Sequence, residues 1–189
     1  MTSNNVQLTT QHATLGGGCF WCLEAVYQQV KGVLHVESGY AGGETLNPDY
    51  DSVCSGQTGH AEVVRLDYDP QLISYKTLLE IFFAIHDPTT LNRQGHDVGT
   101  QYRSVIYFHD GEQEAEASAT ISQLTLDKVF NQPIVTELSA LPIYYKAEQY
   151  HQNYFVDHPD QGYCAFVVSP KLEKFRKNFS ELLIANTST

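Results

Sequence analysis

A glycine-rich run that leads directly into a cysteine is the part of this sequence best suited to chemistry. Residues 16–18 are all glycine, Cys19 follows, and Phe20, Trp21 and Cys22 come next. Glycines let a backbone approach a ligand closely, and the free N–H groups at a helix start favour a thiolate. We therefore expect Cys19 to be an accessible nucleophile with a lowered pKa, although a small buried cysteine beside a tight turn would give the same pattern.

The two aromatic residues after the cysteine have two interpretations. Most aromatic side chains are core anchors, which is the simpler interpretation of Phe20 and Trp21. Beside a nucleophile, the same two rings could enclose a small apolar group of a substrate.

The second cysteine of the run also has more than one interpretation. Cys19-x-x-Cys22 at a helix start has the spacing of dithiol redox centres, but Cys22 could equally pack as a small hydrophobic residue. A structural zinc site needs four ligands. Since the other cysteines, Cys54 and Cys164, form no second Cys-x-x-Cys pair, we expect no metal.

Several side chains outside this run could assist a thiol. A glutamate buried near a thiol, as Glu62 would be, holds its proton at neutral pH and can act as a general acid. Tyr50 and Tyr102 fall in polar loops, where a phenol can donate to a substrate oxygen. The simpler interpretations are a solvated glutamate, packed tyrosines, a turn cap for Asp97 and a surface position for His151.

These residues must be positioned by short strands and helices. Hydrophobic periodicity and capping signals predict strands over 13–15, 33–40, 60–68, 104–109 and 134–138, and helices over 20–30, 74–86, 110–126, 146–155 and 171–184. The polar stretches 41–59 and 87–101 are expected to be functional loops, and 163–168 a loop or short strand. Strands alternating with helices indicate an α+β or α/β domain with helices on a mixed sheet.

Length and composition limit the classes of protein that fit. The 189 residues suit one domain, which we place at 12–185 with flexible tails at 1–11 and 186–189. A net charge of −11 argues against binding to nucleic acid or to anionic membranes. No apolar stretch is long enough to span a membrane, and no signal peptide is visible, so we expect the cytoplasm and reduced thiols.

The motifs around these residues occur together in one order along the chain. They are Gly18-Cys19-Phe20-Trp21 with Glu24, Gly39-Tyr40-Ala41-Gly42-Gly43, Asn47-Pro48-Asp49-Tyr50, Cys54-Ser55-Gly56-Gln57-Thr58-Gly59-His60-Ala61-Glu62, His86-Asp87-Pro88, Gly99-Thr100-Gln101-Tyr102-Arg103-Ser104 and Tyr150-His151-Gln152-Asn153-Tyr154. With them, the chain resembles the A-type peptide methionine sulfoxide reductases over about residues 12–170. The activity of that family reverses the oxidation of methionine to its sulfoxide.

The resemblance implies a fold and a reaction. The fold is α+β, a single two-layer domain with helices packed on a mixed β-sheet and a ferredoxin-like core. The reaction is the reduction of methionine-S-sulfoxide, free or in proteins, to methionine, and its outcome is the repair of oxidised proteins.

The resemblance also implies a role for each site residue. Cys19 matches the nucleophile, which becomes a sulfenic acid, and Glu62 matches the acid that protonates the sulfoxide oxygen. Tyr50 and Tyr102 match phenols that bind this oxygen, and Asp97 matches a supporting residue. The remaining pair, Phe20 and Trp21, matches the walls that hold the S-methyl group.

Recycling of the sulfenic acid is where the chain departs from the family pattern. Many members have Gly at the position of Cys22, and Cys164 matches the family's first recycling cysteine. We therefore favour Cys164 as the resolving thiol, with Cys22 as the alternative and no role for Cys54. The resemblance further implies no cofactor, thioredoxin as the reductant, and a monomer.

Two other functions fit parts of the pattern. A thiol–disulfide oxidoreductase would use Cys19 and Cys22, but the order of elements is not thioredoxin-like, and Glu62 would have no task. A redox-sensing or metal-binding module would not need the complete set of sulfoxide motifs.

Overall fold

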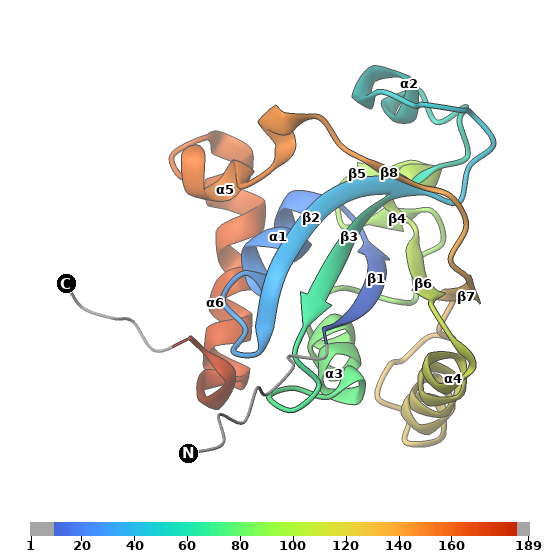
Figure 1. The fold of residues 1–189 in the computed structure, drawn as a ribbon, viewed down its shortest axis with the longest axis vertical. Helices are drawn as coiled ribbons and strands as arrows, with labels where there is room; N and C mark the ends of the chain where they lie inside the picture. Colours follow the sequence, from blue (N-terminus) through green and yellow to red (C-terminus); the bar gives the residue numbers. More distant parts are fainter. Residues whose placement is uncertain (1–9, 185–189) are drawn as a thin grey trace, which may run out of the picture.

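The computed structural model describes residues 10–184, in which strands alternate with helices (Figure 1). The first strand, β1 (Gln11–Gly17), begins one residue inside the stretch 1–11 that we expected to be a tail. The rest of the predicted tails, residues 1–9 and 186–189, lies outside the described residues.

One mixed sheet of six strands, in the order β7-β6-β1-β3-β2-β8, forms the centre of the domain. Besides β1, its strands are β2 (Val33–Ala41), β3 (Ala61–Tyr68), β6 (Ser104–Phe108), β7 (Glu137–Ala140) and β8 (Tyr144–Lys146). All neighbours are antiparallel except β6 and β7, which run parallel.

Helices link these strands in two similar units. The helix α1 (Phe20–Tyr27) connects β1 to β2, and α3 (Tyr75–Ile85) connects β3 to β6. Two such βαβ units with the inner sheet order β6-β1-β3-β2 make the ferredoxin-like arrangement. The predicted α+β fold with helices on a mixed sheet is confirmed.

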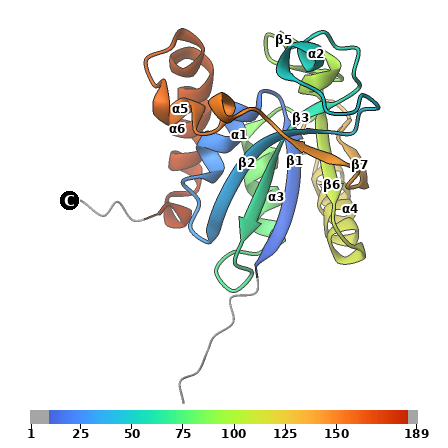
Figure 2. The ribbon, with the colours of Figure 1, turned by 45° about the horizontal axis from the view of Figure 1, so that its top comes forward.

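The helices gather on one face of the sheet (Figure 2). Both α1 and α3 contact α6 (Ser169–Asn178), and α4 (Gly111–Leu126) packs beside α3 and β7. The main core lies between this layer and the sheet. On the opposite face, Leu141 and Tyr144 pack over a smaller buried cluster that includes Val63 and Val105.

The register of β3 directs one carboxylate toward the helices. Alternate residues of a strand point to opposite faces. Val64 and Leu66 belong to the helix-side core, whereas Ala61 and Val63 belong to the cluster on the opposite face. Glu62 shares its parity with Val64 and Leu66, so its side chain points toward the helix layer, where it is buried.

Two predicted segments differ in the structure. The helix expected over 146–155 is instead the end of β8, the 3-10 helix Gln149–His151 and the short α5 (Tyr154–Asp157). Asn153 between them is left-handed, with φ of 58°, which interrupts a right-handed helix. Residues 164–168, expected as a loop or strand, form a π-helix that leads into α6.

The long polar stretches contain short elements of their own. Residues 41–59 include the helix α2 (Tyr50–Cys54), and residues 87–101 include the hairpin of β4 (Arg93–Gln94) and β5 (Asp97–Val98). A 3-10 helix over Thr100–Tyr102 follows β5. These elements lie at the end of the sheet where β1 leads into α1 (Figure 2).

The turn before Cys19 requires glycine. Gly18 has φ of +92°, and a Cβ placed on it would lie 2.6 Å from Cγ of the buried Gln94. The side-chain amide of Gln94 is bonded in both directions to the backbone of Asp87. Gln94 therefore cannot move aside without breaking these bonds.

Gly18→Ala should lower the free energy of unfolding by about 1–3 kcal/mol, because it adds backbone strain and a close contact. Gly111→Ala is the matched control, since Gly111 starts α4 and a Cβ there meets nothing within 4 Å. This control should gain about 0.4–1 kcal/mol. Denaturant unfolding of both variants checks the prediction, and equal stability of the two would contradict it.

Candidate active site

Cys19 lies at the N-terminus of α1, with 5% of its surface exposed. Burial raises the pKa of its thiol well above the usual range, and a hydrogen bond with Cys22 and the charge of Glu62 act in the same direction. The backbone N–H of Trp21 opposes them. The expected lowered pKa and open access are therefore wrong for this structure, because burial outweighs the effect of the helix terminus.

Glu62 is fixed beside this thiol by the backbone of the next residue. Its Oε2 accepts a 3.0 Å hydrogen bond from the N–H of Phe20, and the side chain is 1% exposed. Burial raises the pKa of Glu62 to about 8, and the charge of Asp97 adds to the effect, although the Phe20 N–H opposes both. Glu62 therefore carries its proton at neutral pH and can donate it.

Cys22 and Cys164 are two further buried thiols, and Cys22 interacts with Cys19. A hydrogen bond with Cys19 lowers the pKa of Cys22, and the Lys171 ammonium adds to the effect against the cost of burial. Burial raises the pKa of Cys164, and so does charge on Cys22. Cys22 thus interacts with both of the other thiols, whereas Cys54 is exposed at the end of α2.

The two loop tyrosines keep their protons. Tyr50 begins α2, and Tyr102 ends the 3-10 helix after β5. Burial raises the pKa of both phenols, and the charge of Glu62 raises both further. Both are half-buried hydrogen-bond donors near Glu62.

Asp97 is connected to the site through the side chain of Tyr163. Its Oδ2 accepts a 2.6 Å hydrogen bond from the hydroxyl of Tyr163, the residue before Cys164. Burial raises the pKa of Tyr163, and the charges of Cys19 and Cys22 add to the effect. Tyr163 was not among the predicted site residues, because its motif drew attention only to the cysteine that follows it.

The two aromatic residues after Cys19 differ in exposure. Phe20 is fully buried and packs against Tyr40 and His151, so it cannot itself present a surface to a ligand. Trp21 is half-buried and stacks on Tyr154 with ring centroids 3.7 Å apart. Trp21 therefore offers the ring surface, and Phe20 supports it from the core.

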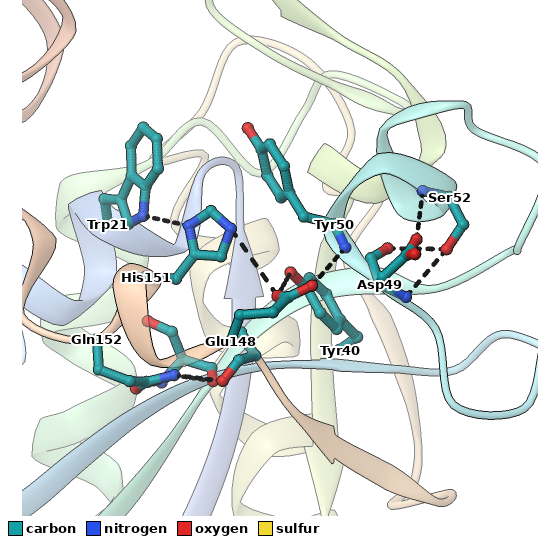
Figure 3. A network of polar contacts seen from close by, with 10 residues as sticks. Trp21, Tyr40, Asp49, Tyr50, Ser52, Glu148, His151 and Gln152 are labelled. Atoms are coloured by element: carbon teal, nitrogen blue, oxygen red, sulfur yellow. Dashed lines mark hydrogen bonds and ion pairs between the residues drawn. The ribbon is translucent and has the colours of Figure 1, made fainter.

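Sequence reasoning missed two buried polar residues that hold this aromatic group. His151 is 1% exposed, so the expected surface position is wrong, and its Nδ1 accepts a 3.2 Å hydrogen bond from Trp21 Nε1 (Figure 3). Glu24 accepts from the backbone N–H groups of Asn153 and Tyr154 at 2.9 and 3.2 Å. Burial raises the pKa of Glu24 to about 7. Both residues lie in the quoted motifs, but spacing alone could not show that their side chains point inward.

The site therefore combines a cysteine thiol with neighbouring side chains that can donate protons or hydrogen bonds. Among residues 10–184, no three His, Cys, Asp or Glu side chains converge as a possible metal site. Within the same range, no helix combines the length and apolar character that crossing a membrane requires. A thiol beside a protonated carboxylic acid and two phenols defines a thiol-dependent oxidoreductase.

Comparison with known proteins identifies the family. Residues 11–183 match the family model "Peptide methionine sulfoxide reductase". MsrA of Polynucleobacter asymbioticus is 59% identical over 175 residues, covering 93% of this chain and 92% of that protein. MsrA of Chromobacterium violaceum is 57% identical over 92% of this chain and 98% of that protein. The chain belongs to the peptide methionine sulfoxide reductase family, in its A type, and the predicted membership is confirmed.

Solved structures agree with this assignment. Reduced Mxr1 of Saccharomyces cerevisiae superimposes with a TM-score of 0.75 at 34% identity, covering 82% of this chain and 89% of that one. The yeast protein has also been solved in complex with Trx2, a structure that matches at 24% identity with a TM-score of 0.53, over 77% of this chain and 84% of that one.

The raised pKa of Glu62 predicts a pH-dependent cost in stability. The group stabilises the fold fully below its ordinary pKa of 4.5, and this contribution is lost as pH rises through about 8. Glu62→Gln cannot ionise, so its free energy of unfolding relative to wild type should rise by a few kcal/mol over that range and then level off. Urea unfolding from pH 5 to 9 measures this. The control is Glu44→Gln at an exposed position, which reports how the same substitution changes the free energy of unfolding where no buried acid is removed. A difference that stays constant with pH would contradict the assignment.

Proposed function

We propose that this protein reduces methionine-S-sulfoxide, free or in proteins, to methionine and so repairs oxidised proteins. The observation that carries the proposal is the pairing of Cys19 with Glu62, a buried acid whose pKa is about 8. Sulfoxide sulfur is a poor electrophile until its oxygen is protonated, so a nucleophilic thiol needs such an acid beside it.

The proposed reaction begins with attack by the sulfur of Cys19 on the sulfoxide sulfur. The electron pair of the S–O bond moves to oxygen, which takes the proton of Glu62 and hydrogen bonds from Tyr50 and Tyr102. The thiol proton of Cys19 returns to Glu62, which passes it to the same oxygen, so the oxygen leaves as water and Cys19 is bonded to the methionine sulfur as a thiosulfonium. The water then attacks the Cys19 sulfur, and the S–S bond breaks with its electron pair on the methionine sulfur. A proton of this water returns to Glu62, which leaves methionine and a sulfenic acid on Cys19. A thiol and a sulfoxide thus become a sulfenic acid and a thioether.

The remaining site residues are assigned supporting roles in this proposal. Asp97 holds Tyr163 beside the thiols through their 2.6 Å hydrogen bond. The S-methyl group lies against Trp21, which Phe20 supports from the core.

A second thiol then condenses with the sulfenic acid, releasing water and leaving a disulfide. We propose Cys22 as this thiol, because it lies three residues from Cys19 on the first turn of α1 and interaction with the Cys19 thiol lowers its pKa. A Cys-x-x-Cys pair at a helix start is also a geometry that disulfides adopt. Cys164, which the sequence favoured, interacts with Cys22 and remains the alternative.

The disulfide requires an external dithiol for its reduction. We propose a thioredoxin, in line with the family resemblance and with the solved complex of yeast Mxr1 with Trx2. We also propose the cytoplasm as the location, because its reducing conditions keep all four cysteines as thiols, which is their state in this structure.

Dithiothreitol-dependent reduction of methionine sulfoxide tests the proposed reaction. Wild type should turn over and Cys19→Ser should not. Glu62→Ala should lower kcat/KM by about 10²–10⁴-fold, and Glu62→Gln by less, because an amide can still donate a hydrogen bond. The wild-type rate should fall as pH rises through about 8, where Glu62 ionises. The rate of Glu62→Gln should not show this decrease. Equal losses in both variants would argue against a donor role.

Peptide mapping after one turnover without reductant identifies the resolving thiol. We expect a Cys19–Cys22 linkage in wild type and in Cys164→Ser, because Cys22 is the direct neighbour of Cys19. Cys22→Ser should accumulate the sulfenic acid, which a dimedone label detects. A Cys19–Cys164 linkage in wild type would assign resolution to Cys164 instead.

A further inference from the structure

The carboxylate of Glu148 joins parts of the site that come from distant stretches of the chain. Its Oε1 accepts a 2.8 Å hydrogen bond from the backbone N–H of Tyr50, and its Oε2 accepts one of 2.8 Å from the Tyr40 hydroxyl. The same Oε2 lies 3.9 Å from Nε2 of His151. Figure 3 shows the carboxylate between these partners. Burial acts to raise the pKa of Glu148, but its hydrogen bonds outweigh this and lower it, so the group is charged at neutral pH.

His151 lies between Glu148 and Trp21 and binds the Trp21 indole. An indole N–H can only donate, so Nδ1 of His151 must be the unprotonated acceptor of the 3.2 Å bond from Trp21. Burial lowers the pKa of His151, so its ring is neutral and the proton lies on Nε2. Among the described residues this buried nitrogen has no hydrogen-bond partner. It faces the charge of Glu148, which favours the tautomer that Trp21 requires.

The segment that carries Glu148 and His151 is anchored to the sheet. The side-chain oxygen of Gln152 accepts a 2.9 Å bond from the backbone N–H of Ser38. The side-chain nitrogen of Gln152 donates to the carbonyls of Ser38 and Ala147 at 2.9 and 3.0 Å. Because Gln152 and Ser38 are buried, these bonds hold the backbone segment that carries Glu148 in place.

We propose that Glu148 is a positioning residue that fixes the separation between Tyr50 and Trp21. It acts on Tyr50 through the backbone of α2 and on Trp21 through His151. The inference rests on the proposed function, in which Tyr50 binds the sulfoxide oxygen and Trp21 borders the methyl group. Oxygen and methyl are attached to the same pyramidal sulfur, so the groups that bind them must keep one separation. A displacement of about 1 Å can cost a hundredfold in rate.

The single tryptophan makes this testable by spectroscopy. Trp21 gives the one indole N–H resonance of the protein in a ¹H–¹⁵N spectrum, and Glu148→Ala should shift it. The same variant should lower kcat for methionine sulfoxide by about 10- to 100-fold. Glu148→Gln keeps an oxygen for the Tyr50 N–H and should recover part of kcat. Glu37→Ala is the matched control, since Glu37 lies on β2 and pairs with Lys146 at 2.8 Å; it should leave both readouts unchanged.

A double-mutant cycle separates positioning from a general loss of stability. Tyr50→Phe removes the hydroxyl that Glu148 is proposed to position, so Glu148→Ala should lose much of its effect on kcat in that background. Fully additive losses would overturn the inference, and so would an unmoved indole resonance with normal kcat. If wild type shows no turnover, the proposed function fails, whereas the indole resonance still decides whether Glu148 holds Trp21.

Discussion

The hydrogen bond from the Phe20 N–H to Glu62 is the contact on which the rest of the site depends. It joins the first turn of α1 to a strand inside the sheet, and it places a carboxylic acid beside the residue that precedes Phe20, the thiol Cys19. Two features elsewhere in the chain make it possible. The left-handed Gly18 turns the backbone so that α1 can begin at once, and the register of β3 points Glu62 at that beginning.

Burial at this contact has two opposite effects on reactivity. It keeps Glu62 protonated, which an acid needs, and it keeps Cys19 protonated, which a nucleophile does not. The two states are linked, since an ionised Glu62 would oppose charge on Cys19. In the proposed reaction, Glu62 gives its proton to the sulfoxide oxygen and receives the thiol proton of Cys19, so neither group has to carry a charge before the substrate binds. In the same proposal, the half-buried phenols of Tyr50 and Tyr102 donate hydrogen bonds without adding charge.

The sequence predicted the parts of this arrangement that depend on local signals. Capping signals and periodicity predicted a helix over 74–86, and Ser74 caps α3 by accepting from the N–H of Thr77. The sheet with its helices follows from periodicity in the same way. The motifs also indicated Glu62 as an acid. The pKa of Cys19 could not be predicted, because spacing shows the helix start but not the burial that outweighs it. The link from Asp97 to Tyr163 was equally hidden, since 66 positions separate the two residues.

The largest error in secondary structure, over residues 146–155, coincides with the part of the chain that supports the site. Its aromatic spacing fits a helix, yet its polar side chains bond to other elements rather than to local backbone. Gln152 binds the backbone of Ser38 on β2, His151 binds Trp21, and Glu148 binds the start of α2. A regular helix would direct these three side chains to one face, because residues three and four positions apart lie on the same side of a helix. Here they bind three separate elements, and the left-handed Asn153 interrupts the helix that would align them. Tertiary hydrogen bonds therefore override local propensity here, and positions where such an override occurs are the ones expected to serve function.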